Sequence, residues 1–291
     1  MGTLTPVTPD ALVCDWTDAE LFAQPEQFRA ERVGASPPTM LDGSERQLLK
    51  WLTRVAYRGD GAIVDLGCWL GGSTAALVDG LRDNPRPAAH SQRVQTYDFF
   101  LWHPAYERYH LGFTHPVGES FLDDFERLVQ PWRERVDLHV GDIASAQWPG
   151  QPIEILFVDI MKDAAGARAV ACNFFPHMMP NRSYLVHQDF KHDFTFWIHL
   201  LMYPLREHIV PVLNVTDAST VMFQLLEVPS REVLEAACDF DALSRADVDA
   251  AFDYSERIVT GCTPDLREQV AKGRVRAKAV LFPTPTLVNA G

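Results

Sequence analysis

The chain has 291 residues, enough for one large α/β domain with appended helices or for two small domains. Its 39 acidic residues outnumber 26 Lys plus Arg, and the net charge of -13 disfavours nucleic acid and anionic membranes as partners. Without an apolar run of about 18 residues or a basic-then-apolar leader, a cytoplasmic location is expected. The five cysteines are scattered with no C-x-x-C pair, so we expect them to pack in the core.

The predicted elements alternate between helices and buried strands. A first helix is expected with Ser44 as its N-cap and Gln47 at the third position of a capping box. Short, almost wholly apolar runs predict strands at 61–67, 93–98, 135–140, 153–159 and 183–189. Helical segments are predicted at 15–35, 73–82, 118–130, 164–178 and 195–207. This alternation is typical of a parallel sheet with right-handed crossovers.

Two further strand-like runs, 208–215 and 219–228, predict a closing hairpin. The whole pattern indicates an α/β fold with a doubly wound, seven-stranded, mostly parallel sheet, preceded by N-terminal helices. Beyond Pro229 the composition turns helical and charged, which indicates an appendage. We therefore expect an N-terminal cap segment, a central domain, and a helical appendage with a tail, at 1–43, 44–228 and 229–291.

The most informative stretch is Asp65–Thr74 (DLGCWLGGST), which lies directly between a predicted strand and a predicted helix. Glycines at such a turn let the backbone approach a ligand closely, and the helix N-terminus presents free N–H groups. A dinucleotide fingerprint needs a second glycine where Trp69 stands, and a P-loop needs a lysine before Ser73. NAD and ATP are therefore disfavoured.

The spacing of Asp65, Gly67 and Gly71 resembles the first motif of the class I S-adenosylmethionine-dependent methyltransferases, and the resemblance covers roughly residues 45–228. It implies a Rossmann-like methyltransferase fold with S-adenosylmethionine as cofactor. It also implies that the acid closing the second strand, Asp98, accepts hydrogen bonds from both ribose hydroxyls. The residues expected at the cofactor are Asp65, Gly67, Cys68, Trp69, Gly71, Ser73, Asp98, Phe99, Asp142 and Ile143, the last two at the adenine.

Oxygen-bearing side chains end the fourth and fifth predicted strands. Asp159, Gln188 and Asp189 could bring three oxygen ligands to Mg²⁺, because adjacent strands lie about 4.8 Å apart. Such a cation would lower the pKa of a substrate hydroxyl and hold its oxygen in line with the methyl group.

Here the resemblance narrows to metal-dependent O-methyltransferases. Asp159–Asp163 is similar to the Asp-x-x-Lys-Asp segment of catechol O-methyltransferase, which implies that Asp159 binds Mg²⁺ and Lys162 is the base. Gln188-Asp189-Phe190 is similar to the Asp-Asp-Tyr strand end of macrolide and aminocoumarin sugar O-methyltransferases. Gln188 departs from that pattern, because it keeps an oxygen but removes a charge from the metal site.

Other residues have two interpretations. Without a metal, His187 and His192 become the acid–base candidates, with His187 closest to the reaction end. His199 is expected to pack on an amphipathic helix. The aromatic segment 99–106 either walls an acceptor pocket or packs as a cap or a dimer contact. Lys162 and Asp163 also suit a solvated turn, with Asp163 capping the next helix.

The function expected is methyl transfer from S-adenosylmethionine to an oxygen of a small hydroxylated acceptor, such as a sugar or a secondary-metabolite precursor. An enzyme of the same fold with different sulfonium chemistry, such as intramolecular displacement, is the alternative. A non-catalytic scaffold is a third class, which an intact set of motif acids disfavours. The appendage and the aromatic segment favour a homodimer.

Overall fold

The computed structural model describes residues 27–109 and 112–283. Seven strands form one sheet in the order β3-β2-β1-β4-β5-β7-β6. Strands β1 to β5 pair in parallel, and β7 runs antiparallel to both β5 and β6. Their bounds are β1 Ala62–Leu66, β2 Val94–Asp98, β3 Val136–Val140, β4 Ile153–Val158, β5 Tyr184–His187, β6 Ile209–Asn214 and β7 Val221–Leu225. This confirms the predicted doubly wound, mostly parallel sheet and its closing hairpin, the Rossmann-like methyltransferase fold.

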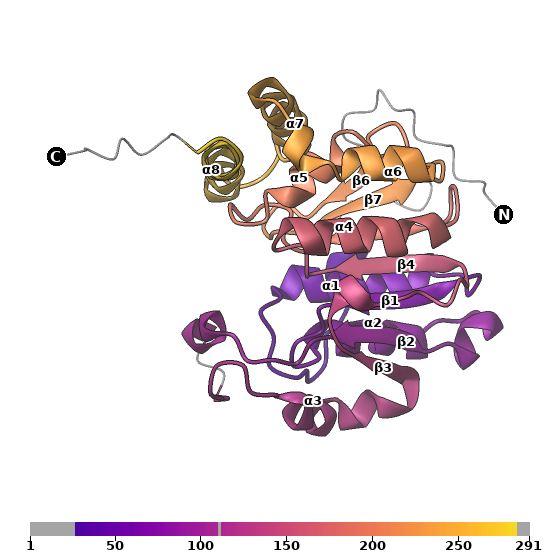
Figure 1. Cartoon of the computed structure of the whole chain (residues 1–291). Coiled ribbons are helices and arrows are strands. Elements are labelled where there is room, and N and C mark those ends of the chain that lie inside the picture. The colour runs from indigo at the N-terminus through magenta and orange to yellow at the C-terminus, as the bar shows by residue number, and fades with distance from the viewer. Residues whose placement is uncertain (1–26, 110–111, 284–291) are drawn as a thin grey trace.

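Helices cover both faces of the sheet (Figure 1). Side chains alternate between two cores, so that in β1 Ile63 packs with α1 and α2 whereas Val64 packs with α4, α5 and the C-terminal helices. None of the described helices combines the length and the apolar character needed to cross a bilayer. The helices are α1 Gly43–Trp51, α2 Gly72–Arg82, α3 Leu122–Val129, α4 Ala164–Asn173, α5 Trp197–Met202, α6 Arg231–Ala237, α7 Arg245–Ile258 and α8 Pro264–Leu281.

Two predicted helix starts have different outcomes. Asp163 caps α4 as predicted, because its Oδ1 accepts a hydrogen bond from the Gly166 backbone N–H at 2.7 Å. The prediction that Ser44 is the N-cap of the first helix is wrong, since α1 begins at Gly43 with Asp42 as its N-cap. Asp42 is an equally good N-cap residue, and Glu45 completes its capping box by accepting from the Asp42 N–H at 2.9 Å.

The ends of the chain are described in part. Residues 15–26 of the predicted helix at 15–35 lie outside the described residues. The prediction is wrong for the rest, because Gln27–Ala30 form a 3-10 turn and residues 31–35 are not helical. Past residue 229, α6, α7 and α8 confirm the predicted helical composition. Helix α7 packs against α5 and α8, so the C-terminal helices extend the core on the α4 side of the sheet.

Candidate functional site

The glycine turn between β1 and α2 has a backbone that requires glycine at two positions. Gly67 and Gly71 have φ values of +90° and +95°, in the left-handed region. A Cβ on Gly67 would lie 2.5 Å from Ile160 Cγ2, and a Cβ on Gly71 would lie 2.2 Å from Val129 Cγ2. The turn therefore keeps its shape only with glycine at both ends.

Asp98 lies at the carboxyl end of β2, beside this turn. Its Oδ2 accepts a hydrogen bond from the Trp69 backbone N–H at 2.8 Å, and its Oδ1 accepts from the Phe100 N–H at 2.7 Å. Burial raises the pKa of Asp98, and these hydrogen bonds act in the opposite direction. The carboxylate is thus held rigidly at the strand end where open α/β sheets bind ligands.

Asp65 lies deeper, at the base of the turn. It is fully buried and accepts hydrogen bonds from Ser73 Oγ at 3.0 Å and Thr74 Oγ1 at 2.6 Å, which fixes the start of α2. Burial, together with the negative charges of Asp159 and Asp98, raises the pKa of Asp65 to about 7. Three carboxylates therefore interact across this edge of the sheet, which favours a positively charged ligand.

The other residues predicted at the cofactor lie around the same edge. Asp142 is exposed and accepts a hydrogen bond from the Ala144 N–H at 2.9 Å, while Ile143 packs partly against the core. Cys68 and Trp69 are buried within the turn. Phe99, directly after Asp98, exposes 55% of its surface, which is unusual for a phenylalanine.

The aromatic segment after Asp98 packs largely against itself. Phe100 and Trp102 are buried and meet the Phe121 ring edge-on, at centroid distances of 5.4 and 5.9 Å. The Tyr106 ring lies 5.6 Å from the Trp69 ring of the glycine turn. The segment thus forms an aromatic cap that reaches the turn, and its part in an acceptor pocket stays a prediction.

The strand ends of β4 and β5 bring three predicted site residues together. Lys162 Nζ donates to Asp159 Oδ1 at 2.6 Å and also forms an ion pair with Asp189. On the other side of Asp189, Oδ1 lies 3.5 Å from His192 Nε2, which also contacts Ser219 Oγ at 3.0 Å. This polar cluster is continuous from β4 to the turn before β7.

Gln188 bonds Glu45 of α1 and Thr220 instead of the acids Asp159 and Asp189. Its Nε2 donates to Glu45 Oε2 at 3.3 Å, and its Oε1 accepts from Thr220 Oγ1 at 3.0 Å. Glu45 also accepts from the Ser219 N–H and Thr220 Oγ1, and burial raises its pKa to about 7. Sequence reasoning missed Glu45, because an acid in the first turn of a helix resembles an ordinary cap. Within 27–109 and 112–283, no group of three His, Cys, Asp or Glu side chains is placed to hold a metal ion.

The structure does not bring His187 to the cluster either. It points into the core on the α4 and α5 side of the sheet, where it is fully buried with its ring 5.8 Å from that of Phe223. Neither ring nitrogen has a hydrogen-bond partner in the described part of the chain, and burial lowers the pKa to about 3. His199 is also buried on this face and bonds Ser255 Oγ at 2.9 Å, so it packs as expected.

The burial of His187 predicts a pH-dependent stability. The pKa of His187 falls from 6.5 to about 3 on folding, so the unfolded chain takes up a proton at a higher pH than the folded chain does. The free energy of unfolding is therefore unaffected by His187 above pH 6.5 and decreases as the pH falls toward 3. His187→Phe removes that loss. When the pH is lowered from about 7.5 to about 5, the free energy of unfolding of the variant should rise by about 2 kcal/mol relative to that of the unmodified chain. This value follows from about 1.36 kcal/mol per pH unit below the unfolded pKa.

Urea unfolding at the two pH values measures this difference. His103→Gln, which changes an exposed histidine, should lose stability toward acid as the unmodified chain does. Equal acid sensitivity in His187→Phe and the unmodified chain would show that His187 accepts a proton in the folded state.

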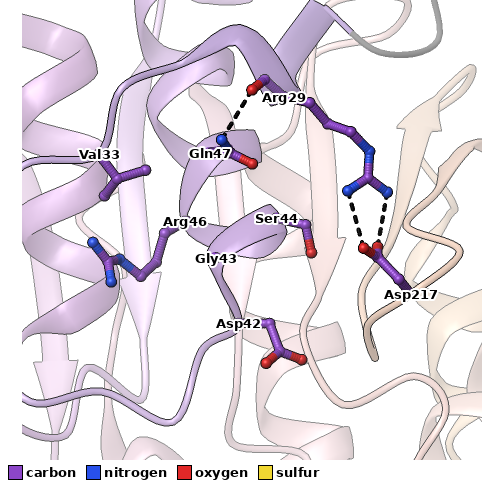
Figure 2. Close-up of a pocket in the computed structure, with 8 residues that line it drawn as sticks. All are labelled: Arg29, Val33, Asp42, Gly43, Ser44, Arg46, Gln47 and Asp217. Atoms are coloured by element: carbon purple, nitrogen blue, oxygen red, sulfur yellow. Dashed lines mark hydrogen bonds and ion pairs between the residues drawn. The ribbon is translucent and has the colours of Figure 1, made fainter.

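A separate pocket of 470 Å³ opens beside the N-terminus of α1 (Figure 2). Its wall is held by two hydrogen bonds of 2.9 Å from Arg29 to Asp217, and by a bond from Gln47 Nε2 to the Arg29 carbonyl. The predicted site residues are not part of this wall, so the pocket lies apart from the glycine turn. Its lining residues are Arg29, Val33, Asp42, Gly43, Ser44, Arg46, Gln47 and Asp217.

No family model matches the chain, and no curated protein matches it in sequence. Among solved structures it is similar to the O-methyltransferase NovP, with 14% identity over 74% of this chain and 91% of that chain and a TM-score of 0.49. It is also similar to an O-methyltransferase from Bacillus cereus in complex with SAH, with 12% identity over 66% and 84% of the two chains and a TM-score of 0.43. The mitomycin 7-O-methyltransferase MmcR shows 14% identity over 63% and 55%, with a TM-score of 0.37. The strand order described above gives this chain the fold of the class I S-adenosylmethionine-dependent methyltransferases.

Proposed function

We propose that this chain transfers a methyl group from S-adenosylmethionine to an oxygen of a small, polar, hydroxylated acceptor, such as a sugar or a secondary-metabolite precursor. The observation that carries the proposal is the carboxylate of Asp98, fixed at the end of β2 by the backbone N–H groups of Trp69 in the glycine turn and of Phe100. A fixed carboxylate suits a vicinal diol, because its two oxygens accept one hydrogen bond from each hydroxyl.

The cofactor side of the site suits a cationic nucleoside. S-adenosylmethionine, when bound, supplies an electrophilic methyl group on a positively charged sulfur. Asp98 would hold the ribose, the Gly67–Gly71 backbone the amino-acid part, and Asp142 with Ile143 the adenine. The interacting charges of Asp65, Asp98 and Asp159 would attract the cation, and its binding would relieve their mutual repulsion.

The residues present fit a magnesium ion poorly. Mg²⁺ takes near-octahedral oxygen ligands, and the expected set was Asp159, Gln188 and Asp189. Both amide atoms of Gln188 are bonded to Glu45 and Thr220. The Lys162 ammonium contacts both remaining carboxylates, so the position between them is filled by a cation of the chain itself. The proposed reaction therefore uses the side chains of the protein alone.

Lys162 is the base that the resemblance implies, but in the proposed reaction it acts as a hydrogen-bond donor to the acceptor oxygen, because Asp159 and Asp189 both contact its ammonium. The proton of the acceptor hydroxyl passes to His192, whose ring is oriented by Asp189 Oδ1 at 3.5 Å and Ser219 Oγ at 3.0 Å. Asp189 also stabilises the imidazolium that results. Asp159 accepts the hydrogen bond from Lys162 and so holds it at the carboxyl end of β4, next to the glycine turn after β1.

The proposal is tested with the whole chain. Calorimetry with S-adenosylmethionine and with S-adenosylhomocysteine should give heat for both. Incubation with S-adenosylmethionine and a cell extract should then yield S-adenosylhomocysteine, at the same rate with and without a chelator. A loss of rate with the chelator would restore a metal between Asp159 and Asp189. Methylthioadenosine in place of S-adenosylhomocysteine would favour intramolecular displacement, and no heat with either compound would refute the proposal.

Asp159→Ala should separate binding from turnover. The change removes one partner of Lys162 and leaves the contacts of Asp98 intact, so affinity for S-adenosylhomocysteine should stay within about threefold. Formation of S-adenosylhomocysteine from S-adenosylmethionine and extract should fall by about 100-fold or more. Asp163→Asn, which retains a capping oxygen on α4, serves as a neighbouring control. Full turnover in Asp159→Ala would place the reaction elsewhere.

A further inference from the structure

Two cysteines lie together where the C-terminal helices meet the central sheet. Cys172 is in the last turn of α4, and Cys238 is the C-cap residue of α6. The two helices pack side by side on one face of the sheet (Figure 1). Both thiols are free, and Cys172 lies close enough to Cys238 to raise the pKa of that thiol. The sequence places 65 residues between them, so only the fold makes them neighbours.

The surroundings of the pair favour thiol chemistry. Cys172 is half-buried and lines a cavity of 830 Å³ along α4 and α6, which Arg168 and Arg231 also line. Arg168 Nη2 donates to the Cys238 carbonyl at 2.9 Å, so a guanidinium lies next to the pair. The thiolate is the form of a cysteine that attacks peroxides. Cys172 lines the cavity and is half-buried, whereas Cys238 is buried, so Cys172 is the nucleophile of the pair.

The other cysteines of the described chain have different surroundings. Cys68 is buried inside the glycine turn, and Cys262 is buried against the Asn214 side chain, with its Sγ 3.2 Å from Asn214 Nδ2. Neither lines the cavity along α4 and α6. Cys172 is therefore the described cysteine that lines this cavity and has both a second thiol and arginines nearby.

We propose that Cys172 and Cys238 form a reversible disulfide on exposure to a hydroperoxide, a modification site that joins the C-terminal appendage to the central domain. The Cys172 thiolate attacks the peroxide and is oxidised to a sulfenic acid, while the departing peroxide oxygen is reduced to water or alcohol. The Cys238 thiol then attacks the sulfenic sulfur, forms the S–S bond and releases water. Each sulfur loses one electron overall, the peroxide gains two, and a dithiol reverses the reaction.

The test uses the reduced whole chain and hydrogen peroxide. After unfolding, two of the five thiols should be lost, and both should return with dithiothreitol. Mass spectrometry of a non-reducing digest should show the peptides of Cys172 and Cys238 joined. Because the new bond closes a loop, the midpoint of thermal unfolding should rise by roughly 5 °C in the oxidised chain.

Matched variants separate this pair from general oxidation. Cys172→Ser and Cys238→Ser should each lose the linked peptide and the rise in unfolding temperature, while Cys262→Ser should keep both. The digest of the unmodified chain decides the matter even if a variant folds poorly. Linkage of Cys172 to another cysteine, or peroxide treatment that leaves both thiols open to alkylation, would overturn the proposal.

Discussion

Asp98→Ala is expected to weaken binding of S-adenosylmethionine and S-adenosylhomocysteine by about 100-fold or more. The change removes the carboxylate proposed to hold the ribose, and a hydrogen bond to a charged group contributes about 1.5 to 3 kcal/mol. It also leaves the backbone N–H groups of Trp69 and Phe100 without their acceptors, so the glycine turn loses its support. The lost ribose contacts and the weakened turn both reduce affinity for the same ligand, and each 1.4 kcal/mol, roughly, raises its dissociation constant tenfold.

Isothermal titration with both compounds measures this effect. Asp123→Ala, which removes an exposed carboxylate in the first turn of α3, should bind as the unmodified chain does and controls for net charge. Circular dichroism of each variant confirms that the sheet is intact. If Asp98→Ala bound S-adenosylhomocysteine with unchanged affinity, the ribose would have to be held by another side chain.

Lys191→Met is expected to lower the free energy of unfolding by about 3 to 5 kcal/mol. Lys191 is fully buried, and its ammonium donates to the carbonyls of Val215, Ala218 and Thr220 at 2.5, 2.6 and 3.3 Å. These carbonyls belong to the turn between β6 and β7, where Ser219 contacts His192. Methionine keeps the length of the side chain but supplies no donor, so the turn loses its anchor and Glu45 loses a nearby positive charge.

Denaturant unfolding near neutral pH measures the loss. Lys272→Met on α8 is the matched control, because Lys272 is 54% exposed and its pair with Glu268 at 2.9 Å should contribute less than about 1 kcal/mol. A loss below about 1 kcal/mol in Lys191→Met would mean that these three carbonyls find other donors.

Local patterns were sufficient for the sheet and for the glycine turn. Each strand was predicted within about three residues of its ends, because a buried parallel strand needs a short apolar run whatever surrounds it. The Gly67 and Gly71 positions could also be predicted, since a left-handed backbone at a strand-to-helix turn favours glycine. The start of α1 shows where local signals compete, because Asp42 and Ser44 are both good N-caps and only one begins the helix.

The candidate reaction site depended on tertiary structure. His192 reaches Asp189 because the chain turns after β5 ends at His187, whereas His187 itself packs on Phe223 of the neighbouring β7. Gln188 binds Glu45, a residue 143 positions earlier, and no local pattern links the two. The sequence by itself therefore determined the strands, the turn and the acids at the strand ends, because each depends on neighbouring residues. The pairing of Lys162 with Asp189 and the approach of Cys172 to Cys238 depend on how distant elements pack, and only the folded chain decided them.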